Sequence, residues 1–167
     1  GGALLVDLGR ANATNFSGGW QRTFTLGAPA TVRFTFDWKV GTRGGLEPDE
    51  YCGAVMMLDG LRYGPTGTAP AFFLGRLFGD GNGTSDLNTA WTGYTIDLPL
   101  PAGAHTLTLG GFCNKTTVNT EFGLVWFDNV SVASISGGSG VLANDTGGAV
   151  TAQLVGNVSH GALILAA

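Results

Sequence analysis

Residues that could carry acid–base or nucleophilic chemistry are few in this sequence and stand far apart. Its two histidines, His105 and His160, have no plausible nucleophile beside them in the chain. The acidic stretch Glu47, Asp49 and Glu50 could supply the two carboxylates of a glycosidase, although a solvated acidic turn or a calcium site explains it better. An enzyme needs a positioned acid, base or nucleophile. We therefore expect no catalytic activity, and a glycan-active hydrolase is the weakest hypothesis.

Asparagine is the residue type with the most unusual spacing. Seven of the nine asparagines open an Asn-x-Ser/Thr triplet, where chance predicts about one or two. A Thr-rich β-protein could generate such triplets by composition, but this excess favours a secreted or cell-surface chain that carries several N-glycans. The seven candidates are Asn12, Asn15, Asn82, Asn114, Asn129, Asn144 and Asn157.

The two cysteines, Cys52 and Cys113, fit the same compartment. They lack a Cys-x-x-Cys spacing and a neighbouring histidine, which argues against a metal or redox site. In an oxidising environment a disulfide between them is the expected state, and it would stabilise the fold by about 4 kcal/mol in the chain-entropy model. Two buried free thiols are the alternative.

The composition favours one β-domain with a full core. The 167 residues are 44% hydrophobic and only 12% charged, with 29 glycines and a net charge of −4. Such a chain is poor in helix formers and rich in strand and turn formers. The negative charge and the absence of a basic cluster argue against a nucleic-acid partner. No apolar run approaches the roughly 20 residues of a membrane span.

Alternating apolar and polar residues predict the strands that would position these groups. The clearest case is TVRFTFDWKV (31–40), in which every second residue from Val32 to Val40 is apolar. Asp59-Gly60 marks a hairpin turn, and Pro99 suggests a strand edge or end. With seven or eight strands and no helical period, we predict an all-β, antiparallel β-sandwich. The expected strand segments are 19–26, 31–40, 53–64, 93–100, 101–112 and 121–132.

Residues 15–133 resemble the jelly-roll, galactose-binding-like modules of large extracellular proteins. The resemblance rests on GGW-x-R-x-F-x-L, an acidic PDEY, LDG, W-x-x-Y, PAGAHTLTLGG and E-x-x-x-x-WFDNVSV, in that order. These motifs are shared by carbohydrate-binding modules and by structural adhesin modules, so they specify the fold more than a ligand.

A second resemblance follows at the C-terminus. GVLANDTGGAVTAQLVGNVSHGALIL (140–165) is similar to the first strands of a cadherin-like (VCBS-type) repeat of surface proteins, with most of the repeat missing. We therefore expect a jelly-roll domain over residues 1–135, a Gly/Ser linker over 136–140, and a short β segment of an incomplete Ig/cadherin-like domain over 141–167. So short a segment cannot bury enough surface alone, so it should pair with further chain or with a neighbouring copy.

The jelly-roll resemblance implies a structural Ca²⁺ ion, held by carboxylates and backbone carbonyls as a hard cation prefers. The matching acidic positions are Glu50 of PDEY and Asp128 of FDNV, with Asp49 and the loop 80–86 as weaker candidates. A strand-end carboxylate that accepts backbone hydrogen bonds is an equal alternative for Asp128.

Sugar binding would require exposed aromatic rings beside polar groups. Trp91, Tyr63 and Tyr94 are the candidates, together with Trp20, whereas alternation assigns Trp38 and Trp126 to the core.

These observations favour a non-catalytic, N-glycosylated structural or adhesive module of an extracellular surface protein or filament. An adhesin stalk, an archaeal thread and a flagellar hair are examples of such assemblies. Its partners would be neighbouring copies or further domains of the same protein. The alternative is a carbohydrate-binding module that recognises extracellular glycans.

The excess of Asn-x-Ser/Thr triplets leads to a direct prediction. Protein isolated from its native source should lose mass on enzymatic or chemical deglycosylation, because several of the seven asparagines are expected to carry glycans. Intact-mass spectrometry before and after treatment measures the difference. An unchanged mass would contradict the secreted-glycoprotein interpretation.

Overall fold

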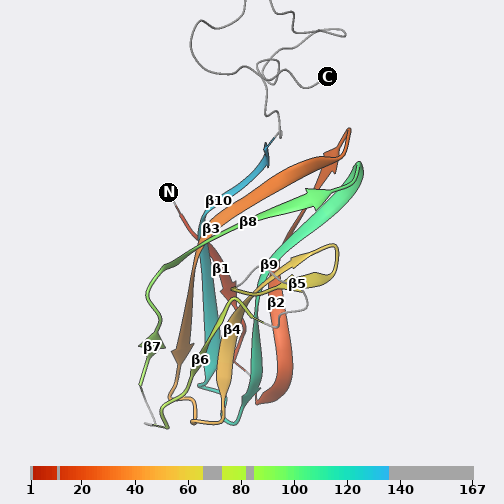
Figure 1. Cartoon of the computed structure of the whole chain (residues 1–167). Helices are drawn as coiled ribbons and strands as arrows, with labels where there is room; N and C mark the ends of the chain where they lie inside the picture. Colours follow the sequence, from red (N-terminus) through yellow and green to blue (C-terminus); the bar gives the residue numbers. More distant parts are fainter. Residues whose placement is uncertain (1, 11, 66–72, 82–84, 136–167) are drawn as a thin grey trace, which may run out of the picture. The chain divides into compact units, whose positions relative to one another are not determined.

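A computed structural model describes residues 2–10, 12–65, 73–81 and 85–135 (Figure 1). Within these residues the chain forms ten β-strands and no helix. Among them there is accordingly no helix suited to crossing a membrane. The strands are β1 (Leu4–Asp7), β2 (Ala13–Leu26), β3 (Ala30–Arg43), β4 (Tyr51–Leu58), β5 (Leu61–Tyr63), β6 (Gly75–Phe78), β7 (Leu87–Asn88), β8 (Thr92–Leu100), β9 (Gly103–Thr116) and β10 (Phe122–Ile135).

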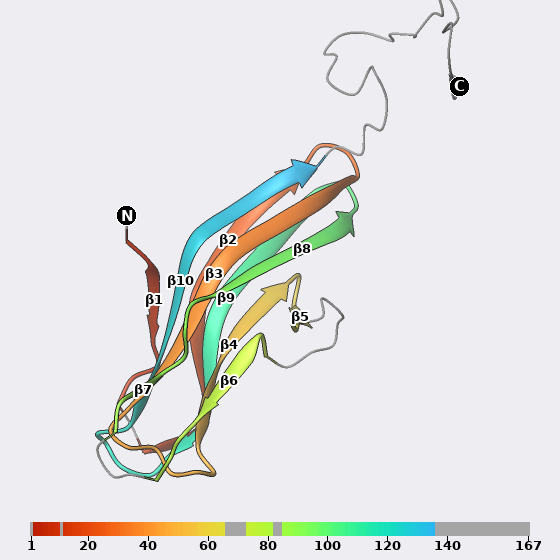
Figure 2. The ribbon, with the colours of Figure 1, turned by 60° about the vertical axis from the view of Figure 1, so that its left-hand side comes forward.

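The strands form two antiparallel sheets that face each other (Figure 2). In sheet A the order is β1-β10-β3-β7, and β8 also pairs with β3. In sheet B the order is β2-β9-β4-β5, and β6 also pairs with β4. This arrangement confirms the predicted all-β, antiparallel β-sandwich. It contains more strands than the sequence pattern suggested, because β6 and β7 are too short to show alternation.

The core lies between the sheets and follows the alternation of β3. Val32, Phe34, Phe36, Trp38 and Val40 are all buried, and each meets side chains from the opposite sheet or from β10. Leu107 and Leu109 of β9 point inward as expected, whereas Thr106 and Thr108, which alternate with them, lie on the outer face.

Trp126 does not belong to this core, contrary to the expectation. In β10 it is Val125 and Phe127 that are fully buried, so Trp126 between them faces outward. There Lys39 and Arg43 lie over its ring, at 5.1 and 5.8 Å from the centroid. The motif WFDNV was assigned to the wrong face because two aromatic residues follow each other and only one can point inward.

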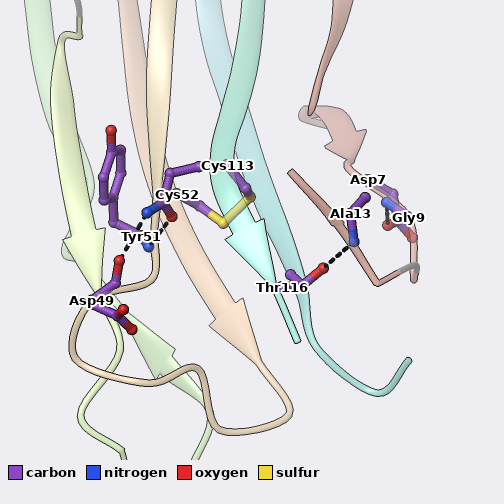
Figure 3. Close-up of a disulfide and its surroundings, with 9 residues drawn as sticks. Asp7, Gly9, Ala13, Asp49, Tyr51, Cys52, Cys113 and Thr116 are labelled. Carbon is purple, nitrogen blue, oxygen red and sulfur yellow. Dashed lines mark hydrogen bonds between the residues drawn. A yellow bond between two sulfur atoms is a disulfide. The ribbon is translucent and has the colours of Figure 1, made fainter. Parts of the chain in front are cut away.

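Cys52 and Cys113 form the expected disulfide, which lies inside the sandwich. The two residues face each other across β4 and β9, and both are fully buried (Figure 3). Gly123 of β10 packs directly against the bond: a Cβ atom at this position would lie 2.5 Å from each sulfur. The glycine therefore lets sheet A approach the disulfide closely.

We call residues 129–135 of β10, which lie uppermost in Figure 1, its upper part. These residues are more exposed than residues 122–128, the lower part. A register shift between Asp128 and Ser131 marks a β-bulge, and Asn129 there adopts a φ of 51°. Beyond the bulge Val130 and Val132 are 39% and 41% exposed. β1 pairs with β10 only up to Phe127, so within the described residues this part of β10 has a strand on one side only.

The chain divides into two units, residues 1–135 and 136–167. The structure describes the first unit. The linker expected at 136–140, the cadherin-like segment expected at 141–167, and His160 all lie outside the described residues.

His105 joins β9 to the hairpin between β4 and β5. Its Nδ1 lies 2.7 Å from Asp59 Oδ2 and its Nε2 lies 3.0 Å from the Pro101 carbonyl oxygen. Both partners are acceptors, so both hydrogen bonds form when the imidazole carries a proton on each nitrogen. These two hydrogen bonds raise the pKa of His105 above its usual value. Partial burial alone would raise the pKa of Asp59, but hydrogen bonds from His105 and Thr106 lower it.

We expect this pair to make stability depend on pH. A raised pKa in the folded state means that the contribution of His105 is fully present below its unfolded pKa of about 6.5 and is lost as the pH rises through the folded pKa. The free energy of unfolding of His105→Gln should therefore fall further below that of the wild type at about pH 5.5 than at about pH 9. Urea denaturation of both proteins measures this difference, and an equal gap at both pH values would contradict it.

Candidate functional site

The three aromatic residues expected to bind sugar have different environments. Trp91, just before β8, is 47% exposed and stays a candidate. Tyr63 is half-buried. Tyr94 is a core residue instead: it is buried, its ring lies 5.1 Å from that of Phe36, and its hydroxyl donates to the Gly64 carbonyl oxygen at 3.0 Å. The assignment of Tyr94 to a binding surface was therefore wrong, because its strand turns this face toward the core.

Trp20 is exposed, and it lines a groove at one edge of the sandwich. It is 53% exposed, and its indole Nε1 donates to the Leu5 carbonyl oxygen at 3.0 Å. The groove has a volume of about 680 Å³ and opens between β2 and the upper part of β10. Most of the side chains that line it are aliphatic, so it offers few partners for sugar hydroxyl groups. Among them are Leu4, Leu26, Val32, Leu107, Leu109, Val130 and Val132.

The outer face of sheet B carries a cluster of aromatic rings that we call the aromatic face. It consists of Tyr51, Phe73, Phe78 and Phe112, grouped around Arg76. The ring of Tyr51 lies 5.8, 5.2 and 6.5 Å from the rings of Phe73, Phe78 and Phe112. The Arg76 guanidinium lies over three of the rings, at 5.2 to 5.6 Å from their centroids.

Local backbone features explain why these rings meet. Tyr51 pairs with Phe78 across β4 and β6, so both side chains point to the same face. Gly53 leaves room for Phe73, since a Cβ atom at 53 would lie 2.5 Å from the Phe73 ring. The Tyr51 amide donates to Asn114 Oδ1 at 2.7 Å, which fixes the start of β4 (Figure 3).

Two hollows flank the aromatic face. One has a volume of about 520 Å³ and is lined by Tyr51, Pro65, Phe73, Leu74, Gly75 and Arg76. The other has a volume of about 390 Å³ and lies beyond Phe112, where Gln21, Arg62 and Thr108 contribute polar groups. These volumes lie in the range of small-ligand sites, about 300–1,000 Å³.

Sequence reasoning missed the aromatic face. Tyr51 was noticed only as part of the acidic PDEY, and the segment from Phe73 to Phe78 was not expected to form a strand. The local signal is the arginine between aromatic residues in FFLGRLF (72–78), but only pairing with β4 brings this segment beside Tyr51.

The described glycosylation candidates fall into two groups. Asn12, Asn15 and Asn129 are exposed, whereas Asn114 is half-buried. Asn114 accepts from the Tyr51 amide and donates from Nδ2 to the Asp49 carbonyl oxygen at 2.8 Å, so its side chain supports the fold. Asn82, Asn144 and Asn157 lie outside the described residues. Whether any of these sites carries a glycan stays a prediction.

Three glutamates meet at the lower end of the sandwich, and together we call them the acidic cluster. Glu47 and Glu50 belong to the loop between β3 and β4, and Glu121 immediately precedes β10. One carboxylate oxygen from each lies within 4.8 Å of the others, an arrangement that could hold a metal ion. Glu50 and Glu121 are 0% and 1% exposed.

Burial raises the pKa of Glu50 to about 7, with further contributions from its hydrogen bond to Glu47 and from the charge of Glu121. The same hydrogen bond lowers the pKa of Glu47. Burial thus keeps the Glu50 carboxyl partly protonated near neutral pH.

Asp128 is not part of the acidic cluster, although the sequence placed it with Glu50. It lies in the middle of β10, opposite Asp37 of β3. Its Oδ1 accepts a hydrogen bond from the Asn129 amide at 2.8 Å. Asp128 thus behaves as a carboxylate that caps the bulge. The signal for the correct partner was the glutamate of E-x-x-x-x-WFDNVSV, which is Glu121.

No family model matches the chain, and no curated protein matches it. Among solved structures the chain is similar to a family 35 carbohydrate-binding module from an environmental isolate. The two are 16% identical over 75% of this chain and 74% of that one, with a TM-score of 0.31. At this level the similarity assigns no ligand, and it gives no support to a cadherin-like repeat.

Proposed function

We propose that this β-sandwich is a non-catalytic, extracellular carbohydrate-binding module, and that its ligand lies on the aromatic face. The observation that carries the proposal is the grouping of Tyr51, Phe73, Phe78 and Phe112 around Arg76 on one side of sheet B, with a hollow on either side.

The chemistry of this surface suits a sugar. The apolar C–H face of a pyranose packs on an aromatic ring, while its hydroxyl groups require hydrogen-bond partners at the rim. Arg76 is held over the rings and offers guanidinium donors. Gln21 and Thr108, which bond to each other at 3.1 Å, and Arg62 offer further polar groups along the second hollow.

Two other features support a non-catalytic role outside the cell. Both ring nitrogens of His105 are engaged by Asp59 and Pro101, so this histidine is not available for proton transfer. The internal disulfide is consistent with an oxidising compartment.

Substitution of Phe78 tests the site. Phe78 is 46% exposed, so Phe78→Ala removes an aromatic ring from the surface without opening the core. We expect the wild type to bind one or more glycans on an array. For Phe78→Ala the affinity for the best glycan should fall at least about tenfold, equal to about 1.4 kcal/mol, while the thermal midpoint stays close to that of the wild type.

Trp91→Ala is the matched control, because it removes a similarly exposed aromatic ring from the segment just before β8. Under the present proposal it keeps wild-type affinity. Loss of binding in Trp91→Ala alone would move the site to the residue that the sequence suggested. Absence of any glycan bound by the wild type would contradict carbohydrate binding altogether.

A structural role in an assembly of copies is the second candidate, and the groove between β2 and β10 favours it. Within the described part of the chain β2 is an edge strand, and β10 beyond its bulge has no strand on one side; Val130 and Val132 are exposed there. Unpaired backbone groups along such an edge are satisfied by another strand. We infer that the occupant is the same edge of a second copy, since antiparallel pairing about a two-fold axis offers each edge an identical partner.

Light scattering after size-exclusion chromatography tests this second candidate. The wild type should show a concentration-dependent dimer, and the double variant Val130→Lys/Val132→Lys should be monomeric, because lysines on an edge disfavour pairing. Glycan binding through the aromatic face should be unaffected. A wild type that is monomeric at high concentration, both with and without glycans, would remove the self-association hypothesis.

A further inference from the structure

We propose that an N-glycan on Asn129 prevents pairing at the open edge of β10, so that only the unglycosylated chain pairs with a second copy. The inference rests on the self-association proposed above for the upper part of β10. It assigns a role to one of the seven Asn-x-Ser/Thr triplets of the sequence, and it is independent of sugar binding at the aromatic face.

The triplet Asn129-Val130-Ser131 lies where β1 no longer covers the edge of β10. β1 pairs with β10 only at Leu124–Phe127, whereas β3 pairs with β10 on both sides of the bulge. Within the described residues, Asn129 thus has β3 on one side and no strand on the other. All three residues of the triplet are exposed, so a glycan has room at this position.

The bulge turns the Asn129 side chain toward the outer face of sheet A. Because of the register shift, Asn129 and Val130 together stand opposite Phe36 of β3. Val130 lines the groove, whereas Asn129 Nδ2 donates to Asp37 Oδ2 at 2.7 Å. Asp37 faces outward, since both its neighbours in β3 are buried. A glycan on Asn129 would therefore start from the outer face, directly beside the open edge.

The Asn129 amide can carry a sugar and keep its bond to Asp37. Nδ2 has two hydrogens, and one of them donates to Asp37. In the transfer, an Nδ2–C1 bond to the sugar forms, the C1–O bond to the phosphate of a lipid-linked sugar donor breaks, and one Nδ2 hydrogen leaves as a proton. Asp37 lies on the side of β3, and the two N–H bonds diverge. With the bond to Asp37 kept, the sugar is directed away from β3, toward solvent and the open edge.

A second copy would bring its own edge to the same place. Paired strands lie about 4.8 Å apart, so the partner strand would pass directly beside Asn129. Two-fold pairing is antiparallel, so it places the two copies of Asn129 at opposite ends of the seam formed by residues 130–135. Glycans are bulky and hydrated, and covering an open edge is a common way to prevent unwanted pairing. A glycan at each end of the seam therefore keeps the second copy away.

Variants of Ser131 test this role without changing Asn129. Asn129 has a φ of 51° and a bond to Asp37, so replacing it would strain the bulge. Ser131→Ala removes the triplet and Ser131→Thr keeps it; Ser131 is exposed, so neither change opens the core. Thr14→Ala is the matched control, because it removes the Asn12 triplet at another exposed position.

The whole chain and each variant are made in a glycosylating eukaryotic host and in a bacterial host that attaches no N-glycans. Glycopeptide mass spectrometry measures occupancy of Asn129, and sedimentation velocity measures the dimer. From the bacterial host all four proteins should dimerise alike. From the glycosylating host the wild type, Ser131→Thr and Thr14→Ala should be monomeric, with a dimer dissociation constant at least about tenfold above that of Ser131→Ala.

The outcomes separate this inference from the self-association on which it rests. Dimers of equal strength in the glycosylated wild type and in Ser131→Ala would overturn the role of the glycan and leave self-association standing. An unmodified Asn129 in the glycosylating host would overturn it as well. If no protein from the bacterial host dimerises, self-association is wrong, and the control of pairing by Asn129 is overturned with it.

Discussion

Cys52 and Cys113 face each other across β4 and β9, and their bond prevents these strands from shifting in register. Side chains alternate along a strand, so the inward position of Cys52 turns Tyr51 to the outer face. Glu50 then lies just before the strand begins, next to Glu121, which precedes the neighbouring β10. A slip of one residue would exchange these faces. The positions of Tyr51 in the aromatic face and of Glu50 in the acidic cluster therefore both depend on the pairing of Cys52 with Cys113.

The two long sides of the sandwich are closed to different degrees. On the side of β5 and β8, Tyr63 and Tyr94 point inward, and the Tyr94 hydroxyl is bonded to Gly64. On the side of β2 and β10 no comparable residue among those that the structure describes closes the gap, and aliphatic side chains line an open groove. One cause is the short β1, which pairs with β10 only at Leu124–Phe127. The aromatic face, which we propose binds a sugar, and the apolar edge, which we propose pairs with another strand, are thus separate surfaces of the sandwich.

The sparse charges of the chain are placed unevenly. Arg33 and Asp97 form an exposed bidentate pair, with both bonds 2.7 Å long, which is typical of surface residues that contribute little to stability. Glu50 and Glu121 are instead buried beside each other in a chain of which only 12% is charged. The two buried carboxylates thus lie together, at the loops that precede β4 and β10.

The sequence by itself determined the all-β class, the alternation of β3, the hairpin at Asp59-Gly60 and the pairing of the cysteines, because these depend on local periodicity, turn chemistry and the absence of other thiols. It did not determine which distant residues become neighbours. Glu121 lies beside Glu50 only because of the order of the strands. Tyr94 is buried and Trp126 faces outward, the reverse of what was expected, because each sheet has two faces and alternation does not say which of them is inside. Only the tertiary structure could decide this, since burial depends on the opposite sheet.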